Sequence, residues 1–207
     1  MMGGMSTSDI LVRVQGLIDR YGDATATQTL LRFFGCCESA EAENAVKEIA
    51  AYCEESISHI GIVVPDIDVV AETLAYMPQQ FSLQKPIISS VSIPRRYPGS
   101  KGKIAFVADK NGNTHFELFE VAWAGSVGEI ERKKRECLIE HIALEVLHAR
   151  SVKKIARIIT NSMKSTHVEL PAMKNNSDGS TFFYIQNNSG ERLEFVFYAR
   201  AHDIARE

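Results

Sequence analysis

Two histidines and two glutamates recur at matching places in two similar stretches of this 207-residue chain. The segment SHIGIVV contains His59 and the segment EHIALEV contains His141, and each histidine is followed by isoleucine. Further along, THFELFEV contains Glu117 and ERLEFVFY contains Glu194, each at the fourth place of its segment. A repeat that keeps histidine and glutamate at matching positions of both copies indicates that the four side chains form one site.

Two imidazoles and two carboxylates form a ligand set that suits a borderline or hard divalent ion, such as Zn, Ni, Co, Mn or Fe. Four protein ligands on a larger coordination sphere also leave room for water or substrate. A single histidine at the start of a strand is more often a packed core residue, and a single strand glutamate usually faces solvent. Repetition in both copies favours the metal site, held by His59, Glu117, His141 and Glu194.

Each of these residues falls on a segment that reads as a β-strand. Side chains alternate between the two faces of a strand, so His59 shares a face with Gly61 and Glu117 shares one with His115. His115 is therefore a further candidate for contact with a substrate, although a packed or exposed histidine would give the same pattern.

The strands belong to a repeated βαβββ order, which predicts an α+β fold of two modules at 56–123 and 139–199. A charged linker at 124–138 separates the modules, and a tail covers 200–207. The expected elements are strands at 57–64, 82–93, 103–109 and 114–122 with a helix from Asp66 to about 77, then strands at 139–147, 166–169, 181–187 and 190–198 with a helix at 150–162.

The region 1–55 has apolar residues at helical spacing and is expected to form a helical N-terminal extension. Ser39 is a suitable N-cap for the last of its helices, since acidic residues follow it. The apolar faces need a partner, which could be the following modules or a second subunit in a homodimer.

The overall composition excludes several classes of function. Hydrophobic residues make up 45% and charged residues 24%, with a net charge of -3, so neither nucleic acid nor an anionic membrane is expected as a partner. The beginning of the sequence is not expected to act as a secretory signal, and no apolar run approaches the ~20 residues that span a bilayer. Four cysteines without a C-x-x-C pair fit reduced thiols in a cytoplasmic protein.

The segments HIGIVVPDID, HFELFEV, EHIALEV and RLEFVFY together resemble the vicinal oxygen chelate superfamily over about 57–199. That superfamily includes glyoxalase I, methylmalonyl-CoA epimerase, extradiol dioxygenases and bleomycin-resistance proteins. The resemblance implies that each module curls into a half-barrel and that the pair encloses a metal. It implies His59 and Glu117 as ligands from the first module, and His141 and Glu194 from the second.

The same resemblance suggests a reaction. Extradiol dioxygenases use two histidines and one glutamate with iron(II), so a fourth ligand at Glu117 favours the isomerase and lyase branch. A glyoxalase I-like enzyme of that branch transfers a proton alpha to a carbonyl by way of a metal-bound enediolate. By similarity, Glu194 is the first choice for the catalytic base and Glu117 the second.

Two alternatives stay open. One is an enzyme like methylmalonyl-CoA epimerase, although that family tends to carry an additional carboxylate base in its first module. This sequence has no Asp or Glu from Thr73 to Ala108. The other is a non-enzymatic protein that binds a small molecule.

The segment without acids is basic, and Arg95 and Arg96 lie in it within a stretch rich in proline and glycine. They could bind an anionic substrate such as a thioester or a thiol conjugate, or belong to an ordinary surface loop.

Overall fold

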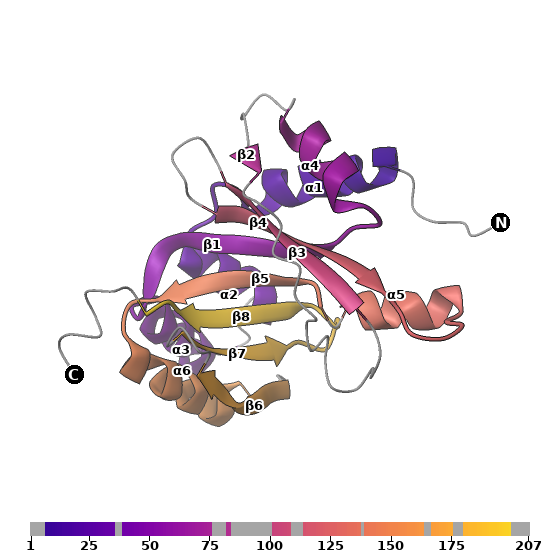
Figure 1. Ribbon diagram of the computed structural model, residues 1–207. Coiled ribbons are helices and arrows are strands. Elements are labelled where there is room, and N and C mark those ends of the chain that lie inside the picture. The colour runs from indigo at the N-terminus through magenta and orange to yellow at the C-terminus, as the bar shows by residue number, and fades with distance from the viewer. Residues whose placement is uncertain are drawn as a thin grey trace. The chain divides into compact units, whose positions relative to one another are not determined.

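The computed structural model describes residues 7–35, 39–75, 82–83, 101–108, 114–137, 139–163, 167–175 and 180–199 (Figure 1). It is an α+β fold, as the sequence predicted. The chain divides into two compact units. The first unit contains Met1–Gly22 and His59–His141, and the second contains Asp23–Ser58 and Ile142–Glu207.

In the first unit, two antiparallel pairings join β2 to β3 and β3 to β4, and β4 runs parallel to β1. The last strand of this unit, β4, therefore lies beside its first strand, β1. The elements of this unit are α1 (Thr7–Tyr21), β1 (Cys53–Val63, of which the part from His59 belongs here), α4 (Ile67–Ala75), β2 (Ser82–Leu83), β3 (Lys101–Ala108), β4 (Thr114–Ala122) and α5 (Glu129–Cys137).

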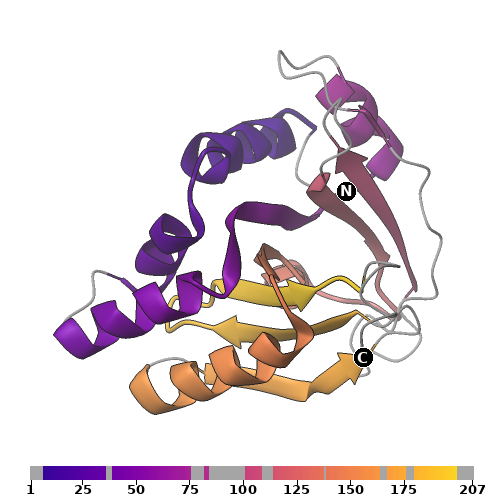
Figure 2. The ribbon, with the colours of Figure 1, turned by 90° about the vertical axis from the view of Figure 1, so that its left-hand side faces the viewer.

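The second unit repeats this pairing scheme. Strand β5 runs parallel to β8, β8 is antiparallel to β7, and β7 is antiparallel to β6. Helix α6 lies along this set of strands (Figure 2). The elements are α2 (Ala26–Phe34), α3 (Ala40–Ala50), β5 (His141–Val146, from Ile142 on), α6 (Ala149–Ser162), β6 (His167–Asn175), β7 (Thr181–Gln186) and β8 (Arg192–Phe197).

The strands of the two units pair in equivalent registers. Gly61 on β1 pairs with Glu117 on β4, and Ala143 on β5 pairs with Glu194 on β8. In both modules the glutamate therefore stands opposite the residue two places after the histidine. Alignment of the segments by sequence gives the same correspondence, so the repeat is a repeat of structure.

Helices cover the strands through apolar faces. In the second unit, α2 and α3 bury Leu30 and Ile49 in one core with the strand residues Phe183 and Phe195, whose rings stack with centroids 5.1 Å apart. In the first unit, helix α1 contacts α4. Burial of an amphipathic stripe is the main source of stability for helices of this length.

The helices of the N-terminal region divide between the units, with α1 in the first and α2 and α3 in the second. Ser39 caps α3 as predicted, since its hydroxyl accepts from the Ala42 N–H at 3.2 Å. A capping box that the sequence analysis missed begins α2, where Thr25 and Gln28 bond to each other's backbone. The predicted division into an extension at 1–55, modules and linker remains a proposal.

The expected strand and helix positions are close to those found, with differences at the ends. Strand β1 begins at Cys53, before the expected start, and β6 continues to Asn175 rather than ending near 169. Helix α5 forms within the charged stretch at 124–138. Most of the strand expected at 82–93 lies outside the described residues. No helix in the described part of the chain is long and apolar enough to cross a membrane.

Candidate metal centre

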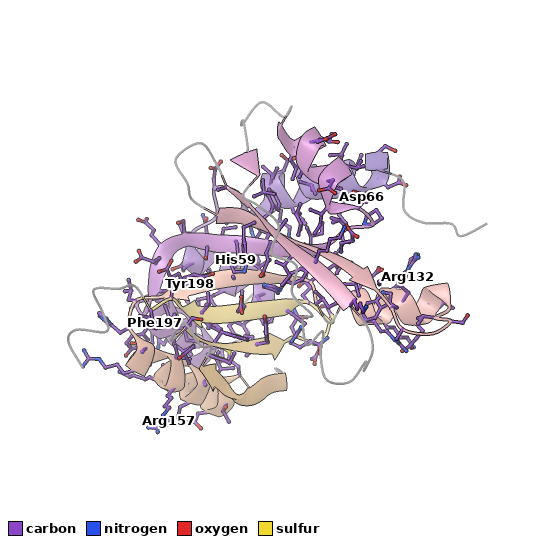
Figure 3. All side chains as sticks on the ribbon, in the orientation of Figure 1. His59, Asp66, Arg132, Arg157, Phe197 and Tyr198 are labelled. Carbon is purple, nitrogen blue, oxygen red and sulfur yellow. The ribbon has the colours of Figure 1, made fainter. Side chains whose placement is uncertain are left out.

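His59 and Glu117 are brought together by adjacent strands of the first unit. Glu117 stands opposite Gly61 in the parallel pairing of β4 with β1, and His59 lies two residues before Gly61. Residues two apart on a strand share a face, and so do paired residues on neighbouring strands. Both side chains therefore project from the same face, and Figure 3 marks His59 on β1.

His141, at the start of β5, completes a cluster of three side chains. Its Nε2 lies 3.1 Å from the Nε2 of His59. Oε2 of Glu117 lies 3.4 Å from each of these nitrogens. Three lone-pair-bearing atoms from distant parts of the sequence thus form a nearly equilateral triangle.

The size of this triangle suits a single divalent cation. Ligand atoms about 2.1 Å from one ion lie about 3.0 Å apart at right angles and about 3.4 Å apart in a tetrahedron. The three observed separations fall within this interval. Among the described residues, these three form a group that could hold a metal.

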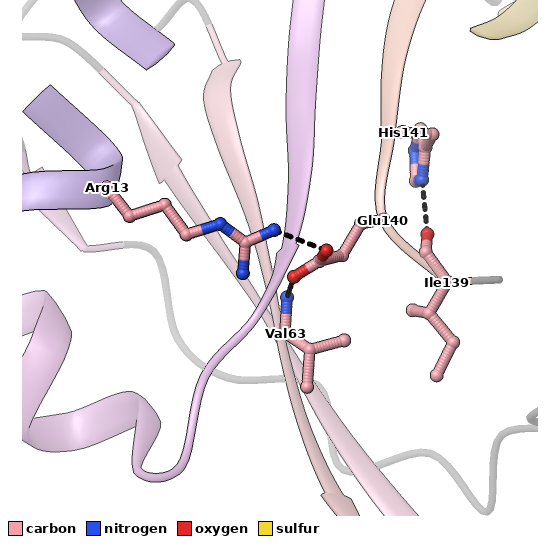
Figure 4. Close-up of polar contacts among 5 residues, drawn as sticks. All are labelled: Arg13, Val63, Ile139, Glu140 and His141. Atoms are coloured by element: carbon pink, nitrogen blue, oxygen red, sulfur yellow. Dashed lines mark hydrogen bonds and ion pairs between the residues drawn. The ribbon is translucent and has the colours of Figure 1, made fainter. Parts of the chain in front are cut away.

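The orientation of His141 is set by the backbone. Its Nδ1 lies 2.7 Å from the carbonyl oxygen of Ile139, and a carbonyl oxygen can only accept, so Nδ1–H donates (Figure 4). In the neutral ring this assigns the tautomer whose Nε2 carries a lone pair. A backbone carbonyl that fixes the tautomer and angle of a histidine in this way is a common support for metal ligands.

Gly61 makes room for the ring of His141. A Cβ built on Gly61 would lie 2.3 Å from Cε1, 2.5 Å from Nδ1 and 2.9 Å from Nε2 of that imidazole. These distances are far below van der Waals contact, so a side chain at position 61 would displace the His141 ring. The second module has Ala143 at the equivalent position, which shows that the strand pairing itself does not require glycine.

The cluster is largely removed from solvent. The side chains of His59 and His141 are 4% and 1% exposed, and that of Glu117 is 16% exposed. Burial raises the pKa of the Glu117 carboxyl, but hydrogen bonds and charge attraction from the protonated forms of His141 and His59 outweigh this effect. The net pKa lies below its usual value of 4.5. A carboxylate kept ionised beside two imidazoles is prepared to bind a cation.

This depressed pKa leads to a prediction for the metal-free protein. A carboxyl whose pKa is lower in the folded state stabilises the fold above its unfolded pKa. That stabilisation is lost as pH falls through the folded pKa, below 4.5. We expect Glu117→Gln to remove this part of the acid sensitivity. Urea unfolding in the presence of a chelator, from pH 7 down to the acid limit, measures it. Parallel curves of unfolding free energy against pH for both proteins would contradict the prediction.

Glu194, His115, Arg95 and Arg96 were also predicted to belong to the site. Glu194 lies on β8 of the second unit, where it is buried at 5% exposure and stands opposite Ala143. His115 lies on β4, and its backbone alone is described. Arg95 and Arg96 lie outside the described residues. Neither the contact of His141 with the Ile139 carbonyl nor the steric role of Gly61 was predicted from the sequence, although a glycine two places after a candidate ligand histidine is a usable signal.

No family model matches the chain, and no curated protein matches it. Solved structures with similar folds include a variant of Streptomyces coelicolor methylmalonyl-CoA epimerase in complex with 2-nitronate-propionyl-CoA. It has 18% identity and a TM-score of 0.44, over 70% of this chain and 97% of that one. Methylmalonyl-CoA epimerase from Mycobacterium tuberculosis has 15% identity and a TM-score of 0.47, over 72% and 91%.

A hypothetical protein from Bacillus halodurans has 15% identity and a TM-score of 0.46, over 70% of this chain and 95% of that one. At such low identity the similarity says nothing of the reaction, which has to be inferred from the chain's own residues.

Proposed function

We propose that this protein is a metal-dependent isomerase or lyase that moves a proton at a carbon alpha to a carbonyl. The observation that carries the proposal is the convergence of His59, Glu117 and His141 to separations of 3.1–3.4 Å. A shared divalent cation would balance the charge of the largely buried Glu117 carboxylate and bind the lone pairs of both imidazoles.

A divalent ion bound here would supply Lewis acidity, polarising substrate oxygens so that the neighbouring C–H becomes acidic. The chain's own residues would hold and orient that ion. The two histidines would bind the ion through neutral rings, and the Ile139 carbonyl holds His141 with Nε2 available. Because imidazoles and carboxylates are shared by Zn, Ni, Co, Mn and Fe, the donor set leaves the choice among these ions to experiment.

A proton acceptor is also needed, and two carboxylates are candidates. The sequence resemblance favours Glu194, with Glu117 as the second choice. Glu194 is the counterpart of Glu117 in the strand register of its own module. Loss of a general base costs about 10²–10⁴-fold in rate. Assays of Glu194→Gln and Glu117→Gln with metal bound would therefore show which glutamate is the base and which is a ligand alone.

The proposed substrates are small α-hydroxycarbonyl compounds or thioesters, including anionic thiol conjugates. An acyl-CoA epimerase is the alternative within this class, and it is the activity named for two of the similar structures. The absence of any acid from Thr73 to Ala108 weighs against it, because that family tends to carry an additional carboxylate base in its first module. Arg95 and Arg96 remain the predicted contacts for an anionic group.

Solvent deuterium exchange tests the proposal. The metal-loaded protein is incubated in heavy water with thiol hemithioacetals and with 2-methyl-branched acyl-CoA epimers, and deuterium at the alpha carbon is measured by mass spectrometry. We expect exchange with one of these classes, abolished by a chelator and restored by metal. Metal-loaded protein that binds members of the panel without exchanging any proton would instead indicate a non-enzymatic binding protein and overturn the proposal.

A further inference from the structure

Glu140, the residue directly before the ligand His141, makes two contacts that neither the sequence pattern nor the proposed reaction explains. Its Oε1 accepts from the Val63 N–H at 3.2 Å, and its Oε2 forms an ion pair with the guanidinium of Arg13 on α1 (Figure 4). The Glu140 side chain is 13% exposed. Ser58 occupies the equivalent place in the first repeat, so an acid here is not part of the repeated motif.

These contacts fix the backbone that carries His141. The N–H groups of Ile139 and Glu140 both donate to the carbonyl of Glu136 at the end of α5, at 2.8 and 3.0 Å. From the other side, the Glu140 carboxylate holds the same segment to the end of β1, the strand that carries His59. The Glu140 carboxylate thus adds a side-chain link between the two backbone segments that carry His59 and His141.

Arg13 contacts the same carboxylate from helix α1. Helix α1 is anchored by Ile10 and Val14, both 0% exposed, on either side of Arg13. The guanidinium thus comes from a packed turn of the helix and forms an ion pair with a mostly buried carboxylate. Without that partner, the carboxylate gains by turning toward water, which would break its bond to Val63.

We propose that Arg13 is a positioning residue for the metal ligand His141, so that the first N-terminal helix is part of the metal centre's support. The inference rests on the metal binding within the proposed function and not on the reaction. Loss of a residue that orients a metal ligand typically lowers metal affinity about 10–100-fold. We expect a loss of that size in Arg13→Ala, and a smaller one in Arg13→Lys, which keeps the charge.

Competition with a chromophoric chelator measures the zinc dissociation constant of the full chain and its variants. Arg13→Ala and Glu140→Gln should each weaken zinc binding, and the double variant should bind no more weakly than Glu140→Gln alone. Arg20→Ala is the matched control, because Arg20 is an exposed arginine of the same helix whose guanidinium lies over the Tyr21 ring. It should bind zinc as the unmodified protein does.

A second readout uses the metal-free protein. The ring nitrogen chemical shifts of His141 should report the tautomer protonated at Nδ1 in the unmodified chain and in Arg20→Ala, and a mixture in Arg13→Ala. Unchanged zinc affinity in Arg13→Ala, or effects of Arg13→Ala and Glu140→Gln that add, would overturn the inference while leaving the proposed reaction intact. Failure of the unmodified protein to bind zinc would overturn both, whereas zinc binding without deuterium exchange would count against the reaction alone.

Discussion

Replacement of His141 with alanine is expected to abolish tight metal binding while the protein remains folded. His141 contributes one of three ligand atoms that lie 3.1–3.4 Å apart, and its removal leaves two. The affinity should fall by more than the about 10–100-fold that loss of a supporting residue costs. Titration with cobalt(II), followed by visible absorption and by competition with a chelator, measures the change.

The matched control is His148→Ala, since His148 is an exposed histidine whose side chain makes no capping hydrogen bond at the start of α6. It should bind cobalt as the unmodified protein does, and circular dichroism should show that both variants are folded. Equal metal content in His141→Ala and His148→Ala would show that the three side chains form a hydrogen-bonded ionic cluster and not a metal site.

Gly61→Ala is expected to cause a comparable loss although it removes no ligand. The new Cβ would lie 2.3–2.9 Å from three atoms of the His141 ring, so the ring has to move by about 1 Å to reach ordinary contact distance. Metal–ligand bonds tolerate deviations of only about 0.2 Å. We therefore expect metal affinity to fall at least about 100-fold, by the same cobalt titration, and overpacking to cost about 1–3 kcal/mol of unfolding free energy.

Gly16→Ala is the control for this substitution. Gly16 is exposed on α1, and a Cβ there would meet nothing within 4 Å. It should leave metal affinity unchanged and stabilise the protein by about 0.5–1 kcal/mol, because alanine is the better helix former. A Gly61→Ala protein that binds cobalt as tightly as Gly16→Ala would refute the steric role assigned to Gly61.

Much of the fold was predictable because its signals are local. Alternating apolar residues and turn residues predicted the strands. The two copies supported the same prediction, since SHIGIVV and EHIALEV both begin a repeat. The pairing of Glu117 with Gly61 and of Glu194 with Ala143 confirms that the repeated letters correspond to repeated positions. The ends of strands were less accurate, as in β1, because strand length depends on which neighbours are available for pairing.

The candidate site was predictable only in part. Residue types that recur in two copies identified His59, Glu117 and His141, and the structure brings these three together. The roles of Glu194 as fourth ligand and base, and of Arg95 and Arg96 toward substrate, stay predictions. No local pattern could have shown that Arg13 contacts Glu140, since 127 residues separate them in the chain.

The packing partner of each N-terminal helix also could not be predicted from the sequence. An amphipathic stripe indicates that one face is buried but not what it is buried against. Helix α1 therefore could not be assigned to the first unit, nor α2 and α3 to the second, until the contacts were known.

Elemental analysis of the purified, unmodified protein tests most directly the claim that His59, Glu117 and His141 share a cation. We predict about one divalent transition-metal ion per chain, removed by a strong chelator and restored stoichiometrically when the chelator is dialysed away and metal is added. Protein that is isolated without metal, and that then shows no saturable binding of zinc, cobalt, nickel, manganese or iron(II), would contradict it.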